Sequence, residues 1–294
     1  MPLRPLPAVL AGLAILSLSA ADAAPRKPAN PAKAATASAA TPGPSDWRTP
    51  DPQDVLVIDT NRGRITVELS PLAAPQTVER IRQLARQHFY DGQTFFRVID
   101  DFMDQTGDPK NNGTGGSSLP DVPPEFDFRR GSDASFTLVD HLEGQVSGLM
   151  GSLPVISQPI ALAAMTSDSR VGAYGTFCPG VAGMARAGAP NSGNSQFFLM
   201  RGTQTKLDKD YTPFGRVIAG EDVVRAIKVG EPPDPPADHI ETVRLLSDLP
   251  PASRPHVQVI NTETPWFAAY VARVRAEKGD SFTVCDLDLP SDVK

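Results

Sequence analysis

The feature of this sequence that most constrains its fold is a regular alternation of apolar and polar residues beside a short turn. Residues 64–69 alternate polar and apolar side chains, and the largely apolar run Val55–Ile58 precedes them. The turn sequence Asn61-Arg62-Gly63 lies between the two segments. A period of two places apolar side chains on one face of a strand, and a short glycine turn joins antiparallel neighbours. The sequence therefore predicts a β-hairpin over Val55–Leu69.

Further segments of the chain have the composition of strands, and two have that of core helices. One helix is predicted to begin at Pro75 and end before Tyr90, and another covers Glu221–Lys228. The first helix has apolar residues on one face at Val78, Ile81, Leu84 and Ala85. Strands are predicted within Thr94–Asp108 and at Val181–Ala185, Phe197–Leu199, Tyr211–Val217 and Ile240–Leu246. Many strands with two core helices and no regular strand–helix alternation indicate a mainly β protein with a closed antiparallel barrel.

The first 23 residues have the pattern of a secretory signal peptide. Arg4 provides a positive start, Ala8–Ala20 an apolar core, and Ala21-Asp22-Ala23 a small-x-small cleavage site. The apolar core is shorter than a membrane span, so a retained anchor is the less favoured alternative. The expected location is the periplasm. The net charge of −6 argues against non-specific nucleic-acid binding.

Composition divides the remaining chain into three parts. Residues 24–53 are rich in alanine and proline and are expected to form a flexible linker. The main domain is predicted over 54–248, with a long inserted loop region at about 128–177, where prolines interrupt an apolar run. Residues 249–294 form a C-terminal extension that is expected to dock on the domain. It contains a helix capped by Thr264 and ended by Gly279, followed by the strand-like segment S-F-T-V-C.

The two cysteines, Cys178 and Cys285, lie in a chain with an export signal. Because exported proteins meet an oxidising environment, we expect a disulfide that ties the extension to the domain. Two separate buried thiols are the alternative.

A single arginine, Arg97, lies in the apolar stretch T-F-F-R-V-I-D-D-F-M-D-Q-T-G-D, with Gln105 further along. A guanidinium keeps its charge when it is buried, so it needs an acceptor, and in a cleft that acceptor can be a ligand. An arginine that reaches to solvent from a strand edge is the structural alternative. The glycine-rich N-N-G-T-G-G-S that follows lacks the Lys-Ser/Thr ending of a phosphate loop, and a tight turn is expected there.

The second informative stretch is P-G-V-A-G-M-A-R-A-G-A-P-N-S-G-N-S-Q-F-F-L-M, over Pro179–Met200. Its G-N-S-Q segment lacks the second glycine of a nucleophile elbow, so Ser195 is expected to be a loop or strand-start residue. The four histidines show neither triad nor metal-ligand spacing. A hydrolase that uses Ser195 is therefore disfavoured.

Taken in order, these blocks, together with the later L-D and F-G-R-V, resemble the cyclophilin-type peptidyl-prolyl cis-trans isomerases. The likeness covers about residues 54–248 outside the insertion. It implies an eight-stranded antiparallel barrel capped by two helices, isomerase activity on proline-containing polypeptides, no cofactor or metal, and a monomer. The resemblance places the catalytic arginine at Arg97, with Gln105 beside it.

The resemblance also assigns substrate-binding positions. These fall on Phe102, Met103, Ala185, Arg186, Ala187, Gln196, Phe198, Leu207 and Tyr211. Phe96, Arg186 and Lys206 depart from the family pattern, where histidine, asparagine and an aromatic residue are usual. The loss of the aromatic residue at Lys206 puts cyclosporin-type inhibition in doubt. A second hypothesis is a chaperone or scaffold that binds proline segments with little catalysis.

Overall fold

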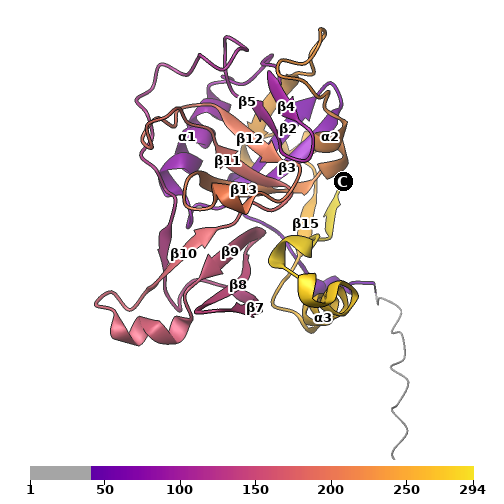
Figure 1. The fold of residues 1–294 in the computed structure, drawn as a ribbon. Helices are drawn as coiled ribbons and strands as arrows, with labels where there is room; N and C mark the ends of the chain where they lie inside the picture. The colour runs from indigo at the N-terminus through magenta and orange to yellow at the C-terminus, as the bar shows by residue number, and fades with distance from the viewer. Residues whose placement is uncertain (1–40) are drawn as a thin grey trace, which may run out of the picture. The chain divides into compact units, whose positions relative to one another are not determined.

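The computed structural model describes residues 41–294, whose strands form three antiparallel sheets (Figure 1). The largest sheet has eight strands in the order β14-β2-β3-β13-β11-β12-β5-β4. These strands are β2 Val55–Thr60, β3 Gly63–Leu69, β4 Arg97–Ile99, β5 Met103–Thr106, β11 Val181–Met184, β12 Phe197–Met200, β13 Thr212–Ala219 and β14 Ile240–Leu245. The predicted hairpin is confirmed, because β2 and β3 pair from Val55↔Glu68 to Thr60↔Gly63.

The eight-stranded sheet curls into a half-barrel, and its two edges approach each other beside β4 and β14. Thr94 forms an isolated bridge with His239. The Phe95 amide donates to the Asp238 carbonyl at 3.0 Å, and the Ile240 amide donates to the Gln93 carbonyl at 2.8 Å. The edges thus meet through single pairs rather than a continuous ladder of β4 with β14. The prediction of a mainly β fold with eight antiparallel strands is confirmed, whereas the predicted closure of these strands into a barrel is not.

Two helices cover the inner face of this sheet, as predicted. Helix α1, Pro75–Arg86, begins with proline at its first turn, where the missing N–H is not needed. Helix α2, Glu221–Ala226, is shorter than predicted, because Ile227 is already extended. The buried faces of both helices join the strands in one apolar cluster, the inner core, which includes Val78, Ile81, Leu84, Val224 and Ile227.

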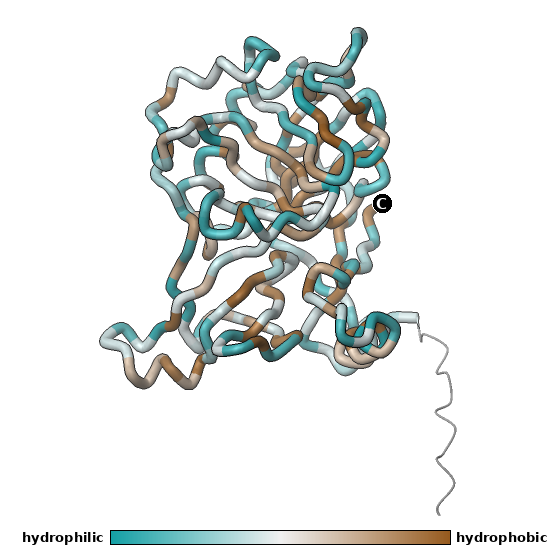
Figure 2. The backbone as a smooth tube through the Cα atoms, in the orientation of Figure 1, coloured by the Kyte–Doolittle hydropathy of each residue, from teal (hydrophilic) through white to brown (hydrophobic). Residues whose placement is uncertain are grey.

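The opposite face of the sheet has an apolar cluster of its own, the outer core. Successive side chains of a strand point to opposite faces. In β12, Phe197 and Leu199 therefore belong to the inner core, whereas Phe198 and Met200 belong to the outer core. In Figure 2, apolar segments coloured brown run through the strands of this sheet.

The inserted region is a five-stranded antiparallel sheet, which corrects the prediction of a long inserted loop. Its order is β6-β10-β9-β8-β7. The strands are β6 Phe128–Arg130, β7 Thr137–Leu142, β8 Gln145–Met150, β9 Leu153–Ser157 and β10 Val171–Gly175. Pro154 cannot donate to the ladder of β9, but its carbonyl accepts the Thr176 amide at 3.0 Å. The Thr176 carbonyl that faces it accepts the Cys178 amide instead, also at 3.0 Å, so no acceptor is left open. Pro159 lies beyond the strand and precedes the 3₁₀ helix η3, Ile160–Met165.

The third sheet joins both ends of the described chain. It consists of β1 Trp47–Arg48, β15 Val257–Ile260 and β16 Ser291–Val293. Because β1 pairs with β15, the predicted flexible linker cannot extend to residue 53. The predicted signal peptide and the linker up to residue 40 lie outside the described residues. In residues 41–294, no helix has the length and apolar character needed to cross a membrane.

The extension contains helix α3, Pro265–Lys278, capped by Thr264 and followed by Gly279 as predicted. Its Phe267 and Val274 are buried in the outer core. The predicted strand S-F-T-V-C is wrong: these residues form the 3₁₀ turns η7 Gly279–Ser281 and η8 Val284–Asp286. The structure contains the expected disulfide between Cys178 and Cys285, which lie 107 residues apart.

Candidate active site

The arginine of the organising stretch and its polar neighbour lie side by side on adjacent strands. Arg97 in β4 is paired with Gln105 in β5, and Gln105 is paired with Phe198 in β12. Directly paired residues of antiparallel strands project to the same face. Because Phe198 belongs to the outer core, the register places Arg97 and Gln105 on the outer face as well.

A chain of side-chain hydrogen bonds connects Arg97 to the glycine-rich loop. Arg97 Nη1 donates to Gln105 Oε1 at 3.5 Å, and Gln105 Nε2 donates to Gln196 Oε1 at 3.0 Å. Gln196 Nε2 in turn donates to the carbonyls of Gly113 and Gly115, at 3.1 and 2.8 Å. Each amide accepts at one end and donates at the other, so the loop carbonyls determine the orientation of both glutamines. We call this chain the glutamine relay.

The glycine-rich loop is built around the buried carboxylate of Asp108. This carboxylate accepts the backbone amides of Lys110, Asn112 and Gly113 at 2.6–3.1 Å. Burial alone would raise the pKa of Asp108, but these hydrogen bonds outweigh it and keep the pKa below its usual value. A Cβ on Gly115 would lie 1.9 Å from Asp108 Oδ1, so the loop requires glycine there. The tight turn was predicted, but the role of Asp108 was missed, although aspartate before small residues is a turn signal.

Apolar side chains pack beside the charged group. Met103 and Phe198 are 1% and 5% exposed, and Phe102, Leu207 and Tyr211 are half-buried against the same outer core. The rings of Phe198 and Tyr211 meet edge to face at 5.8 Å. The Arg97 guanidinium lies 5.9 Å from the centre of the Phe102 ring. The structure therefore brings the five apolar candidates together in the cluster that borders Arg97.

The three candidates at residues 185–187 adjoin this apolar cluster, and Ala185 is itself buried in the outer core. Ala185 and Ala187 donate their amides within the protein, to the Gln196 carbonyl and Ser192 Oγ, both at 2.9 Å. Arg186 Nε donates to the Asp210 carbonyl at 2.9 Å, and its guanidinium lies 4.6 Å from the centre of the Tyr211 ring. The Arg186 side chain thus covers Tyr211.

Sequence reasoning missed one partner of Arg97, which is Glu231. Arg97 Nε donates to Glu231 Oε2 at 2.7 Å, and the side chains of this ion pair are 40% and 51% exposed. The two residues are 134 positions apart, so no local pattern connects them. A cleft at this point is lined by Phe96, Arg97, Gln105, Asn111, Asn112, Gly113, Glu231 and Pro232.

Two other features of the sequence have structural explanations. Ser195 is fully buried, and its hydroxyl donates to the Gly107 carbonyl at 2.8 Å, as expected for a strand-start residue. Lys206 is exposed on the 3₁₀ turn η4, Thr205–Leu207, beside the half-buried Leu207. Within residues 41–294, no group of three or more potential ligands among histidine, cysteine, aspartate and glutamate could hold a metal ion.

The fold and the site together define a class: a mainly β protein whose curled sheet presents an arginine donor beside an apolar cluster. Residues 55–245 match the family described as cyclophilin type peptidyl-prolyl cis-trans isomerase/CLD. A probable peptidyl-prolyl cis-trans isomerase of Brucella suis biovar 1 is 32% identical over 191 residues, covering 61% of this chain and 74% of that protein. The chain therefore belongs to the cyclophilin-type peptidyl-prolyl cis-trans isomerases.

A solved structure extends this likeness beyond the family-matched residues. The crystal structure of cyclophilin AquaCyp293 from Hirschia baltica has a TM-score of 0.78 and 35% sequence identity to this chain. The match covers 85% of this chain and 94% of that one, so it also includes residues outside 55–245.

Proposed function

We propose that this peptidyl-prolyl cis-trans isomerase accelerates rotation about Xaa-Pro bonds of exported proteins, with Arg97 as the hydrogen-bond donor. One observation carries the proposal. Nη2 of the half-exposed Arg97 has no hydrogen-bond partner in the described part of the chain, whereas Nε and Nη1 are occupied. A fixed guanidinium with an open donor edge beside an apolar cluster fits an acceptor that arrives with a proline ring.

The chemistry requires no covalent step. Rotation about a peptide C–N bond is slow because the bond has partial double-bond character, with a barrier of about 18–20 kcal/mol. When the amide twists, resonance is lost and the proline nitrogen becomes a better hydrogen-bond acceptor. A charge-assisted bond from Arg97 strengthens as the twist develops, so it lowers the barrier rather than only binding the ground state.

The apolar cluster and the glutamine relay have supporting roles in this proposal. Phe102, Met103, Phe198, Leu207 and Tyr211 hold the pyrrolidine ring while the preceding carbonyl rotates. The apolar surroundings lower the local dielectric and strengthen the field of the Arg97 guanidinium. The relay through Gln105 and Gln196 restricts the orientation of that guanidinium.

The test is two-dimensional exchange NMR on a short Xaa-Pro peptide with residues 24–294 as wild type and as Arg97→Ala. Removing one pre-organised donor typically slows catalysis about 10²–10³-fold, and this is the expected loss. The melting temperature should change little, because the arginine is half-exposed. Wild-type exchange rates with a folded Arg97→Ala protein would refute the role of Arg97.

A second candidate function, a chaperone that binds unfolded chains, is favoured by an exposed apolar segment. Ile160, Leu162 and Met165 of η3 are 40%, 39% and 84% exposed. Under this alternative, suppression of client aggregation survives Arg97→Ala but falls when Leu162 and Met165 are replaced by serine. Loss of both activities in Arg97→Ala would count against it.

Export to the periplasm is part of the same proposal. The disulfide between Cys178 and Cys285 supports an oxidising compartment. Expression of the full chain in a Gram-negative host should give a periplasmic protein whose N-terminal residue, by mass spectrometry, is Ala24. An uncleaved cytosolic product with free thiols would refute export.

A further inference from the structure

Glu231 lies beyond the sheet edge next to β4, and its carboxylate contacts Arg97. We propose that Glu231 is a positioning residue, which fixes the guanidinium plane of Arg97 so that the open Nη2 edge faces the twisting amide. This inference rests on the proposed catalytic role of Arg97.

The contacts around the guanidinium show why one acceptor would not be enough. The bond to Gln105 is 3.5 Å long, at the limit of a hydrogen bond, whereas the bond to Glu231 is 2.7 Å. The two acceptors occupy different edges of the planar fork, Nη1 and Nε. Together they restrict rotation about the end of the side chain and leave Nη2 open. Glu231 supplies the stronger of the two contacts.

The backbone places Glu231 directly opposite Arg97. Gly230, its neighbour in sequence, exchanges two backbone hydrogen bonds with Val98, the neighbour of Arg97, at 2.8 and 2.9 Å. This bridge fixes the distance between the two chain segments one residue away from each charged side chain. A Cβ on Gly230 would lie 2.3 Å from Pro233 Cα, so the loop requires glycine at the bridge.

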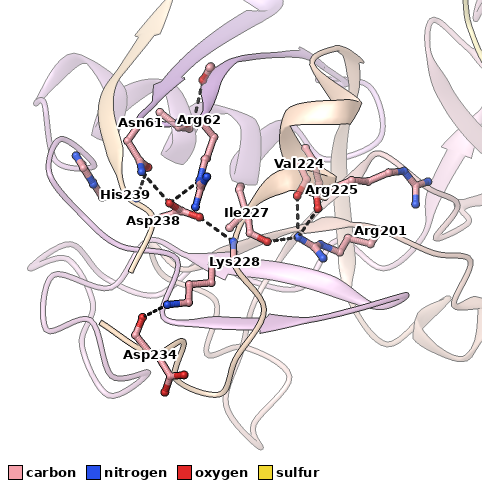
Figure 3. A network of polar contacts seen from close by, with 12 residues as sticks. Asn61, Arg62, Arg201, Val224, Arg225, Ile227, Lys228, Asp234, Asp238 and His239 are labelled. Atoms are coloured by element: carbon pink, nitrogen blue, oxygen red, sulfur yellow. Dashed lines mark hydrogen bonds and ion pairs between the residues drawn. The ribbon is translucent and has the colours of Figure 1, made fainter. Parts of the chain in front are cut away.

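A buried carboxylate holds the base of the loop that carries Glu231. Asp238 is 2% exposed and accepts hydrogen bonds from Asn61 Nδ2, Arg62 Nε and the Lys228 amide at 2.7–2.8 Å (Figure 3). Burial alone would raise the pKa of Asp238, but these hydrogen bonds outweigh it and hold the pKa below its usual value. Lys228 Nζ also donates to the Asp234 carbonyl at 2.8 Å, which connects the start of the loop to its middle.

Stability alone does not account for this ion pair. Pairs with both partners as exposed as Arg97 and Glu231 contribute little to the free energy of folding, because water and salt screen them. Orientation is a separate effect, because a donor held in the reactive geometry avoids the entropy of ordering a long side chain during the reaction. Glu231 therefore matters mainly for turnover.

The experiment compares Glu231→Ala and Glu231→Gln with wild type and with Glu79→Ala. Glu79 pairs with Arg82 on helix α1 and has no contact with Arg97, so it controls for loss of a surface glutamate. Exchange NMR at several peptide concentrations gives kcat and KM separately. We expect Glu231→Ala to lower kcat about tenfold, with KM within twofold of wild type and an unchanged melting temperature. Glu231→Gln keeps an oxygen acceptor for Nε and should recover most of kcat.

Salt provides a readout that a purely structural role would not move. Screening weakens the exposed Arg97–Glu231 pair, so kcat of wild type should fall between 0.05 and 1 M salt, and that of Glu231→Gln should stay nearly constant. Wild-type kcat in Glu231→Ala, or a kcat above wild type, would overturn the positioning role. If Arg97→Ala is inactive in the same assay, that outcome leaves the proposed function intact; if Arg97→Ala is fully active, both proposals fail.

Discussion

Two arginines of the same sheet, Arg97 and Arg201, show opposite ways of placing a guanidinium. Arg201 follows β12, and its side chain is 2% exposed. Its Nε donates to Asp104 at 2.6 Å, and its Nη1 donates to Asp100 at 3.1 Å. Its Nη2 donates to the carbonyls of Val224, Arg225 and Ile227 at the end of α2 (Figure 3). Every nitrogen of Arg201 is engaged, whereas Arg97 is half-exposed with Nη2 open.

The difference separates a structural cation from one available to a ligand. Arg201 satisfies the last carbonyls of α2, which carry the negative end of the helix dipole, and it neutralises a buried carboxylate. Arg97 has one exposed carboxylate partner and a long bond to an amide. Burial and the number of occupied donors thus distinguish the two roles better than residue type does.

The largest expected effect is on stability, from Arg201→Met. At pH 8, where Asp104 is ionised, removing the guanidinium leaves a buried carboxylate without a charged partner, and breaking a buried pair typically costs about 3–5 kcal/mol. Urea unfolding under non-reducing conditions should show a loss of this size. Activity per folded molecule should stay at the wild-type level, and a variant that is stable but inactive would break the comparison.

Arg97→Lys should lower activity and leave stability nearly unchanged, the reverse of Arg201→Met. Lysine keeps the charge but lacks the planar fork that can contact Glu231, Gln105 and the substrate together. We expect kcat/KM for an Xaa-Pro peptide to fall about 100-fold, equivalent to ~2.7 kcal/mol, with less than 0.5 kcal/mol lost in unfolding. Retention of wild-type kcat/KM would mean that charge alone is sufficient.

The sequence predicted the parts of this arrangement that depend on local pattern. The alternation at Ile65, Val67 and Leu69 gave the hairpin, and the cap at Thr264 gave the start of α3. The site residues followed from family motifs that lie within short stretches. The pairing of Arg97 with Glu231 could not be predicted in this way, because it depends on how a loop 134 residues further along the chain lies against strand β4.

The five-stranded sheet of the insertion was missed for another physical reason. Strands β8 and β9 are buried on both faces over nearly their whole length, so their residues show no alternation of apolar and polar side chains. A continuous apolar run that contains a proline is equally compatible with a buried strand and with a packed loop. The pairing of β1 with β15 was equally hidden, because β1 has only two residues and its partner lies some 200 positions away.

The buried pair should also give the protein a pH-dependent stability. Burial raises the pKa of Asp104 to about 7, against an ordinary value of 3.8, although Arg201 opposes the shift. Its second oxygen, Oδ2, has no partner in residues 41–294, in keeping with this direction. A folded-state pKa above the unfolded value adds stability that is complete below the unfolded pKa and is lost as pH rises toward 7.

The free energy of unfolding should therefore fall between pH 4.5 and 7.5, by on the order of 2 kcal/mol. Asp104→Asn should be less stable at pH 4.5 and show a flatter dependence in urea titrations across this range. None of the histidines in the described chain is buried as Asp104 is. An equally steep fall of stability in Asp104→Asn would assign the pH dependence to another group and contradict the assignment to Asp104.

The smallest expected effect comes from the glutamine relay. It tests whether the relay helps to hold Arg97 in the orientation that leaves Nη2 open. Gln196→Leu keeps a similar volume but removes the acceptor for Gln105 and the donor to Gly113 and Gly115. Gln105 can then rotate, and the weaker of the two contacts that orient Arg97 is lost. Because the stronger contact to Glu231 remains, we expect kcat to fall only about threefold, ~0.7 kcal/mol, which is less than in Glu231→Ala.

Gln158→Leu is the matched control for this substitution. Gln158 accepts the Gly172 amide at 2.9 Å within the inserted sheet, so this variant also loses an amide-to-backbone bond, but away from Arg97. Exchange NMR should show wild-type kcat in Gln158→Leu and a reduced kcat in Gln196→Leu. Combining Gln196→Leu with Glu231→Ala should then approach the loss seen in Arg97→Lys, because a guanidinium without either acceptor keeps its charge but not its orientation. Two independent effects of about threefold and about tenfold would instead multiply to about 30-fold, about threefold short of the loss in Arg97→Lys, and that outcome would contradict a shared role in orientation.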